Sequence, residues 1–145
     1  MVHNFRKITD HFYAAPQIEP DEIDVAASEG FAAIIMNRPD GETPDQPATA
    51  LIKDRADANQ LPFVHIPITA PPQMSDVKAT LEVLKAHEGE KVLAFCRSGT
   101  RSTTLWAYAV ALDKAMPVND ILTAAMNGGY DLSPHRPALE ALFAL

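Results

Sequence analysis

The 145-residue sequence has a single cysteine, no long apolar segment, no excess of positive charge and no cluster of metal ligands. A single cysteine forms no internal disulfide, which is typical of proteins from reducing compartments. No apolar run approaches the roughly 20 residues of a membrane-spanning helix, and residues 1–16 lack the apolar core of a signal peptide. We therefore expect a cytoplasmic protein without a membrane segment.

The charge balance and the positions of the histidines exclude two further classes of protein. The formal net charge of −7 argues against nucleic acid or an anionic membrane as the main partner. The five histidines are scattered without zinc-ligand spacing, so we expect no metal and no other cofactor. A small anionic substrate remains open, because a local pocket can be positive on an acidic protein.

Apolar runs and turn-forming residues alternate along the chain in a pattern that predicts an α/β fold. Apolar runs at 31–37, 62–68 and 91–95 indicate strands buried on both faces, and two shorter pieces within 5–14 indicate edge strands. Two helices are expected at 19–30 and 48–59, and a third is capped by Ser75 and ended by Gly89. Three more are expected at 101–113, 117–127 and 136–145. The prediction is a single domain over residues 1–145, with a mainly parallel central sheet and helices on both faces.

The cysteine lies where such a fold binds ligands, directly after a buried strand and before a helix. A tight loop that leads into a helix turns several backbone N–H groups inward and forms an anion pocket. Gly99 permits the sharp turn, and Arg101 is placed to bind two oxygens of an anion. In this setting Cys96 is expected to act as a thiolate nucleophile, although a lone cysteine after a strand is most often a small core residue.

Other polar residues near the loop have two interpretations each. Ser102 either donates a hydrogen bond to the thiolate or is an ordinary helix cap. Arg38 and Asp40 follow the strand at 31–37, so they either line the pocket or only shape the turn. The remaining loop residues are expected to contribute backbone N–H groups or, for the arginine, to attract an anionic substrate: Arg97, Ser98, Gly99 and Thr100.

The loop sequence resembles the active sites of two groups of cysteine enzymes. It reads CRSGTRS, which is similar to the loop of rhodanese-type sulfurtransferases, whose cysteine carries a persulfide. It is also similar to the cysteine phosphatase signature His-Cys-x-x-Gly-x-x-Arg-Ser. Over residues 5–130 the chain resembles the phosphatase-like domain of beta-lactamase hydrolase-like proteins, through FAAIIMNRPDGE with QPA shortly after, FVHIPI and AFCRSGTRSTTLWA. That resemblance implies a tyrosine or dual-specificity phosphatase-like fold, which in some members is fused to a persulfide dioxygenase domain.

Three departures from the phosphatase pattern bear on the chemistry. Arg101 follows Cys96 by five residues where phosphatases have six, and Phe95 stands where they usually have a histidine. Residues 69–72 contain no carboxylate to protonate a leaving oxygen. The nearest carboxylate is Asp76, for which a charge in the first turn of a helix is the favoured interpretation over a catalytic acid.

Transfer of a sulfane sulfur tolerates these absences, because its leaving groups need no such protonation. The sequence therefore favours, by a narrow margin, a sulfurtransferase with a persulfide on Cys96. The alternative is a phosphatase with a phosphocysteine intermediate. A third alternative is a non-catalytic domain that binds an anion or senses redox state through Cys96, although both nucleophile and arginine are kept.

Overall fold

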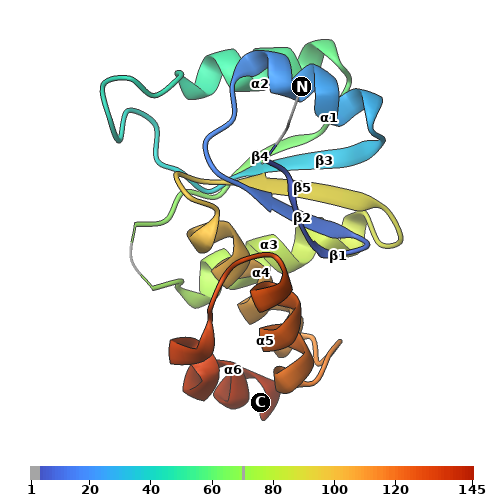
Figure 1. Ribbon diagram of the computed structural model, residues 1–145, viewed down its shortest axis with the longest axis vertical. Helices are drawn as coiled ribbons and strands as arrows, with labels where there is room; N and C mark the ends of the chain where they lie inside the picture. The colour runs from blue at the N-terminus through green and yellow to red at the C-terminus, as the bar shows by residue number, and fades with distance from the viewer. Residues whose placement is uncertain (1–3, 70) are drawn as a thin grey trace.

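A five-stranded sheet forms the centre of the protein in the computed structural model, which describes residues 4–69 and 71–145 (Figure 1). His3, one of the five histidines, lies outside the described residues. So does Ala70, which belongs to the segment 69–72 that contains no carboxylate. The sheet order is β1-β2-β5-β3-β4, with β1 antiparallel to β2 and every other pair parallel. The strands are β1 (Arg6–Thr9), β2 (Phe12–Ala15), β3 (Phe31–Met36), β4 (Phe63–His65) and β5 (Lys91–Phe95).

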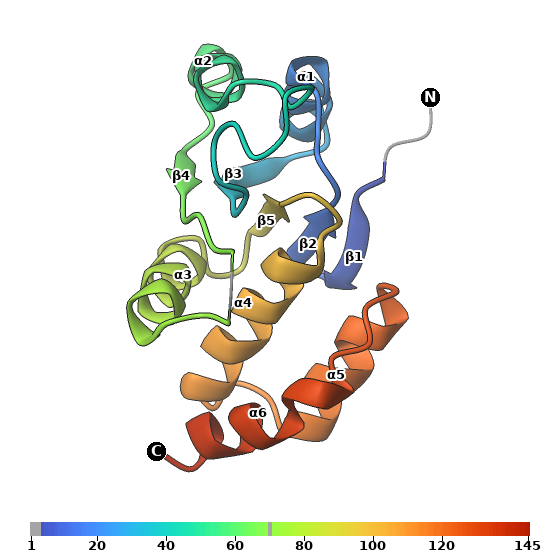
Figure 2. The same cartoon turned by 90° about the vertical axis from the view of Figure 1, so that its left-hand side faces the viewer.

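Helices cover both faces of this sheet, as the sequence predicts (Figure 2). One face carries α1 (Pro20–Ser28) and α2 (Thr49–Ala58), and the other carries α3 (Met74–Ala86) and α4 (Thr100–Leu112). Outside α4 pack α5 (Val118–Asn127) and α6 (Arg136–Phe143), the latter preceded by the short 3₁₀ helix η1 (Ser133–His135). Among the described residues, no helix combines the length and the apolar character needed to cross a membrane.

The continuous apolar runs of the central strands are explained by two cores, one on each face of the sheet. Alternate residues of a strand point to opposite faces. In β3, Ile34 packs with the core under α1 and α2, whereas Ile35 packs with the core under α3 and α4. In β5, Leu93 and Ala94 divide in the same way. Both faces are buried, so these strands show no polar alternation.

Three predicted details of the fold are wrong. β2 is an interior strand rather than an edge strand, because it pairs with β1 on one side and with β5 on the other. β4 is a short, half-buried edge strand, although Ile66 N still donates to Met36 O beyond its end. The third helix begins after Gln73 rather than at Ser75, because the side chains of Gln73 and Asp76 form a reciprocal capping box.

The end of α5 packs closely against the edge strand β1 at Gly128. A methyl group at Gly128 would lie 2.3 Å from Ile8 Cδ1 and 3.1 Å from Lys7 O. Because Ile8 must shift and the carbonyl of Lys7 belongs to the strand backbone, Gly128→Ala should lower the free energy of unfolding by about 1–3 kcal/mol. Urea unfolding followed by circular dichroism measures this loss.

Ile8→Val serves as the matched background for that experiment, because it removes the Cδ1 atom that the new methyl group would meet. The cost of Gly128→Ala should be smaller in this background than in the wild-type protein. Equal costs in the two backgrounds would show that the contact with Ile8 is not the cause.

Candidate active site

The carboxyl ends of β2, β3 and β5 meet at one edge of the sheet, and Cys96 lies between them. Its backbone N–H donates to Ala15 O, which ends β2, at 3.3 Å. On the other side, Asn37 N donates to Phe95 O at 2.8 Å, and Asn37 follows β3. The peptide unit that joins Phe95 to Cys96 is therefore fixed by hydrogen bonds on both sides. Cys96 itself is fully buried.

The loop after Cys96 is compact and turns one N–H group directly onto the sulfur. Gly99 N donates to Cys96 Sγ at 3.1 Å. Gly99 has φ +96°, in the left-handed region that favours glycine, and α4 begins at the next residue. Ser98 Oγ and Thr100 Oγ1 share a hydrogen bond of 3.1 Å across this turn. Of the loop residues at 97–100, Gly99 thus supplies the amide that contacts the sulfur, and Ser98 and Thr100 brace the turn.

Arg101, in the first turn of α4, is oriented by two acceptors from other parts of the chain. Its Nη1 and Nη2 donate to the two carboxylate oxygens of Glu42, each at 2.9 Å, and Nη1 also donates to Ile68 O at 2.8 Å. These bonds occupy the far end of the planar guanidinium. The edge formed by Nε–H and the second proton of Nη2 takes no part in them, and such an edge matches two oxygens of an anion.

Glu42 joins two arginines and was not singled out by the sequence analysis. In addition to Arg101, it accepts a hydrogen bond from Arg38 Nε at 3.0 Å. The bond from Arg101, followed by the bond from Arg38, lowers the pKa of Glu42 to about 2, although partial burial opposes this shift. The same contact with Glu42, and then the proximity of Cys96, raises the pKa of Arg101. The carboxylate, both guanidiniums and the sulfur therefore form one electrostatic cluster.

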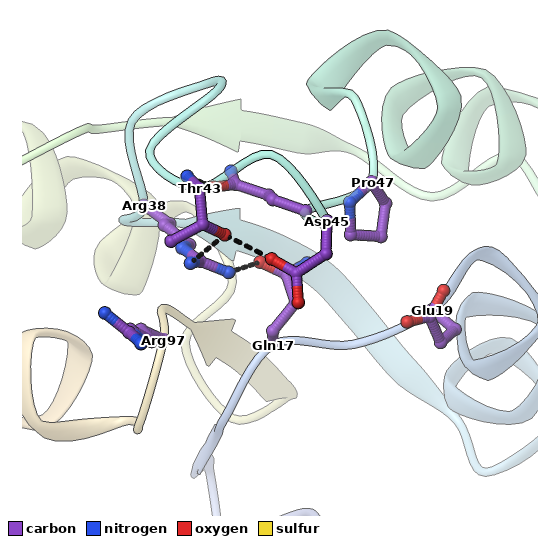
Figure 3. Close-up of a pocket in the computed structure, with 8 residues that line it drawn as sticks. Gln17, Glu19, Arg38, Thr43, Asp45, Pro47 and Arg97 are labelled. Carbon is purple, nitrogen blue, oxygen red and sulfur yellow. Dashed lines mark hydrogen bonds between the residues drawn. The ribbon is translucent and has the colours of Figure 1, made fainter.

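Arg38 also forms the base of a polar pocket beside the cysteine loop (Figure 3). Its side chain is only 4% exposed, and its Nη1 and Nη2 donate to Gln17 Oε1 and Thr43 Oγ1 at 2.9 and 3.0 Å. Arg97, from the loop after β5, lines the edge of the same pocket. The pocket measures about 250 Å³ and is lined by Gln17, Glu19, Arg38, Thr43, Asp45, Gln46, Pro47 and Arg97.

Three other predicted site residues lie differently. Ser102 is buried, and its hydroxyl forms no hydrogen bond with any residue that the structure describes, so it neither bonds the sulfur nor caps α4, whose N-cap is Gly99. Asp40 accepts hydrogen bonds from the backbone and hydroxyl of Thr49 at the start of α2. Asp76 accepts from the backbone of Gln73 at the start of α3. Neither aspartate lines the polar pocket, and both stabilise helix ends.

Tyr130 is a further contact of the loop that the sequence analysis did not find. Its hydroxyl donates to Ser98 O at 3.0 Å, and only 5% of the residue is exposed. It follows the two glycines of the segment NGGY, and those glycines were the only local signal. For Glu42 the local signal was its position four residues after Arg38, in the same turn.

Comparison with known proteins agrees with this architecture. Residues 4–113 match the model of the family described as beta-lactamase hydrolase-like protein, phosphatase-like domain. A beta-lactamase hydrolase-like protein of Agrobacterium fabrum is 36% identical over 107 residues, which is 73% of this chain and 25% of that protein. The chain thus spans about a quarter of the length of this curated relative.

Solved structures show the same fold over almost the whole chain. A protein of Neisseria meningitidis, described provisionally as a phosphatase, is 34% identical with a TM-score of 0.80 and covers 97% of this chain and 99% of its own. Tk-PTP in its active form is 19% identical with a TM-score of 0.74 and covers 99% of both chains. The predicted resemblance to tyrosine phosphatase-like folds is therefore confirmed.

The ion pairs of Glu42 should make stability depend on pH in a defined window. Its pKa is about 2 in the folded protein against an ordinary 4.5, so its contribution is fully present above pH 4.5 and is lost as the pH falls toward 2. At neutral pH, Glu42→Gln should lower the free energy of unfolding by about 1–2 kcal/mol, because solvent screens part of the interaction. This difference from wild type should shrink below pH 4.5 in urea unfolding experiments.

Glu29→Gln is the matched control, since Glu29 is exposed after the end of α1. It should have little effect at either pH. A Glu42→Gln difference that stayed constant from pH 7 to pH 3 would contradict the assignment of a lowered pKa to Glu42.

Proposed function

Because this chain belongs to the family of the beta-lactamase hydrolase-like protein, phosphatase-like domain, we propose that it is a cysteine-dependent phosphatase that hydrolyses small phosphate monoesters. The observation that carries the proposal is the arrangement around Cys96. Gly99 N–H points at the sulfur, and the Arg101 guanidinium, held by Glu42, interacts with the same sulfur. A nucleophile faces a place where anionic oxygens would be bound.

The loop amides and Arg101 would bind the phosphoryl oxygens. The N–H groups at the start of α4 and the guanidinium edge stabilise negative charge, which is greatest in the transition state. Glu42 does not compete for this edge, because it occupies the other end of the guanidinium. Glu42 would instead orient Arg101 before the substrate binds.

The reaction has two steps on one sulfur. The Cys96 thiolate attacks phosphorus, so that an S–P bond forms while the P–O bond to the leaving group breaks and the leaving oxygen keeps the electron pair. Water then attacks the phosphocysteine, which restores the thiolate and releases inorganic phosphate. The leaving oxygen in the first step takes its proton from solvent.

No carboxylic acid among the described residues near the loop is placed to protonate the leaving oxygen, although His135 shares a pocket with Thr100 and Arg101. Thr69, Pro71 and Pro72 contribute no carboxylate, and Asp76 caps α3. Glu42 is nearest to Arg101, but its pKa of about 2 leaves it ionised at neutral pH and unable to donate a proton. The arrangement therefore favours esters whose leaving groups are weak bases.

An aryl phosphate with such a leaving group, p-nitrophenyl phosphate, tests the proposal. Cys96→Ser should abolish its hydrolysis, because a serine hydroxyl in this loop is a poor nucleophile. Arg101→Ala should lower kcat/KM by about 10²–10³, the usual effect of removing one preorganised donor to a transition state. Release of p-nitrophenolate measures both, with Arg136→Ala, on the exposed surface of α6, as the control arginine. Hydrolysis that survives in Cys96→Ser would reject the assigned nucleophile.

Sulfur transfer is the second candidate, and the compact loop supports it. The five-residue spacing from Cys96 to Arg101 and the single Gly99 amide on Sγ suit a small sulfur atom, and sulfur transfer needs no acid. In this reaction the thiolate takes the outer sulfur of a sulfane donor and passes it from the persulfide to a thiophile. The comparisons favour the phosphatase, so the order of the two alternatives is reversed relative to the sequence analysis.

Intact mass spectrometry distinguishes the candidates, because the chain has one cysteine. For a phosphatase, incubation with thiosulfate should leave the mass of the wild-type protein unchanged. A gain of one sulfur atom that is absent in Cys96→Ser and removed by cyanide would make sulfur transfer the better assignment. Absence of both persulfide and phosphatase activity would favour a binding or sensing role.

A further inference from the structure

The peptide unit that joins Ser98 to Gly99 is bonded at both ends. Its carbonyl accepts a hydrogen bond from the Tyr130 hydroxyl at 3.0 Å, and its N–H donates to Cys96 Sγ at 3.1 Å. A peptide unit is planar, and in its trans form the C=O and N–H groups point in opposite directions. Whatever fixes the direction of the carbonyl therefore also fixes the direction of the N–H group at the sulfur.

The ring of Tyr130 packs directly against this peptide. A methyl group built at Gly99 would lie 2.0 Å from the Tyr130 hydroxyl oxygen and 2.7 Å from Cζ. The guanidinium of Arg6 lies over the other part of the ring, 5.4 Å from its centroid. Tyr130 thus has little freedom to leave the peptide, and Gly99 is required both for its positive φ and for this close approach.

The hydroxyl of Tyr130 is suited to act as a permanent donor. Burial raises its pKa, ahead of the opposing effect of Arg6, so it stays protonated at neutral pH. Tyr130 also lies beyond residues 4–113, the part of the chain that matches the family model. The segment after α5 therefore reaches the cysteine loop from outside the matched region.

We propose that Tyr130 is a positioning residue for Cys96, which acts through the Ser98–Gly99 peptide to aim and polarise the Gly99 N–H at the sulfur. A hydrogen bond to a carbonyl strengthens the N–H donor at the other end of the same amide. A stronger and better directed donor stabilises negative charge on sulfur, whatever electrophile the sulfur attacks. The inference rests on the proposed role of Cys96 as nucleophile, but not on whether phosphorus or sulfur is transferred.

Tyr130→Phe tests the inference, because it keeps the ring and removes only the hydroxyl. The kcat for p-nitrophenyl phosphate should fall about three- to tenfold, the effect of one hydrogen bond of ordinary net strength, while KM changes less than about twofold. Alkylation of Cys96 by iodoacetamide at neutral pH should slow by a similar factor. In ¹⁵N-labelled protein, the Gly99 amide proton should move upfield as its hydrogen bond weakens.

Tyr108→Phe is the matched control. Tyr108 is likewise a buried tyrosine under the C-terminal helices, and its hydroxyl shares a hydrogen bond of 2.8 Å with His135 Nδ1 rather than with the loop. This variant should leave the alkylation rate and the Gly99 amide resonance unchanged. If Tyr130 had only a structural role, Tyr130→Phe would, like Tyr108→Phe, leave the alkylation rate and the Gly99 amide resonance unchanged. The two variants would then differ only in their stability.

Two results would overturn the inference. One is a Tyr130→Phe protein with the wild-type Gly99 amide resonance and alkylation rate, and the other is an equal change in Tyr108→Phe. The amide and alkylation measurements need no turnover, so they decide the inference even if the wild-type protein hydrolyses no phosphate ester. Absence of hydrolysis together with the expected amide and alkylation changes would reject the proposed function and support the role of Tyr130.

Discussion

The candidate active site depends on the ion pairs that the Glu42 carboxylate forms with Arg38 and Arg101. Arg38 is almost completely buried, and a buried cation is strongly destabilising unless a carboxylate and hydrogen bonds compensate its charge. Glu42 supplies that carboxylate and also pairs with Arg101, which lies in the first turn of α4. The turn after β3 and the start of α4 are therefore joined by one ionised group. This connection explains how a flexible arginine side chain is oriented in the absence of substrate.

The cysteine loop imposes a second constraint, which is one of space. Between Cys96 and Arg101 the chain must reverse direction and start a helix within four residues, so the turn needs a left-handed residue at Gly99. The same glycine leaves room for Tyr130, and the two requirements reinforce each other. In the proposed reaction, the loop amides, the N–H groups at the start of α4 and Arg101 would share the stabilisation of negative charge.

The sequence predicted the central part of the fold because local pattern and tertiary position agree there. β3 and β5 are apolar throughout since both faces are buried, and the position of Cys96 after β5 follows from that assignment. Edge and interior strands were confused because pairing partners are not encoded in a four-residue strand such as β2. Glu42 and Tyr130 were missed for a similar reason. Their decisive contacts, with Arg101 and Ser98, join residues 59 and 32 positions apart.

The two candidate reactions make different demands on the same residues. Both need a nucleophilic sulfur, an anion-binding group and a fixed loop, and in the proposal these are Cys96, Arg101 and the loop that Gly99 and Tyr130 hold in place. Only the hydrolysis of an ester with a basic leaving group also needs a proton donor. Asp76 stabilises a helix start, and Glu42 is kept ionised by two arginines. These two carboxylates therefore serve structure and orientation, and the reaction proposed on this site uses substrates whose leaving groups need no carboxylic acid.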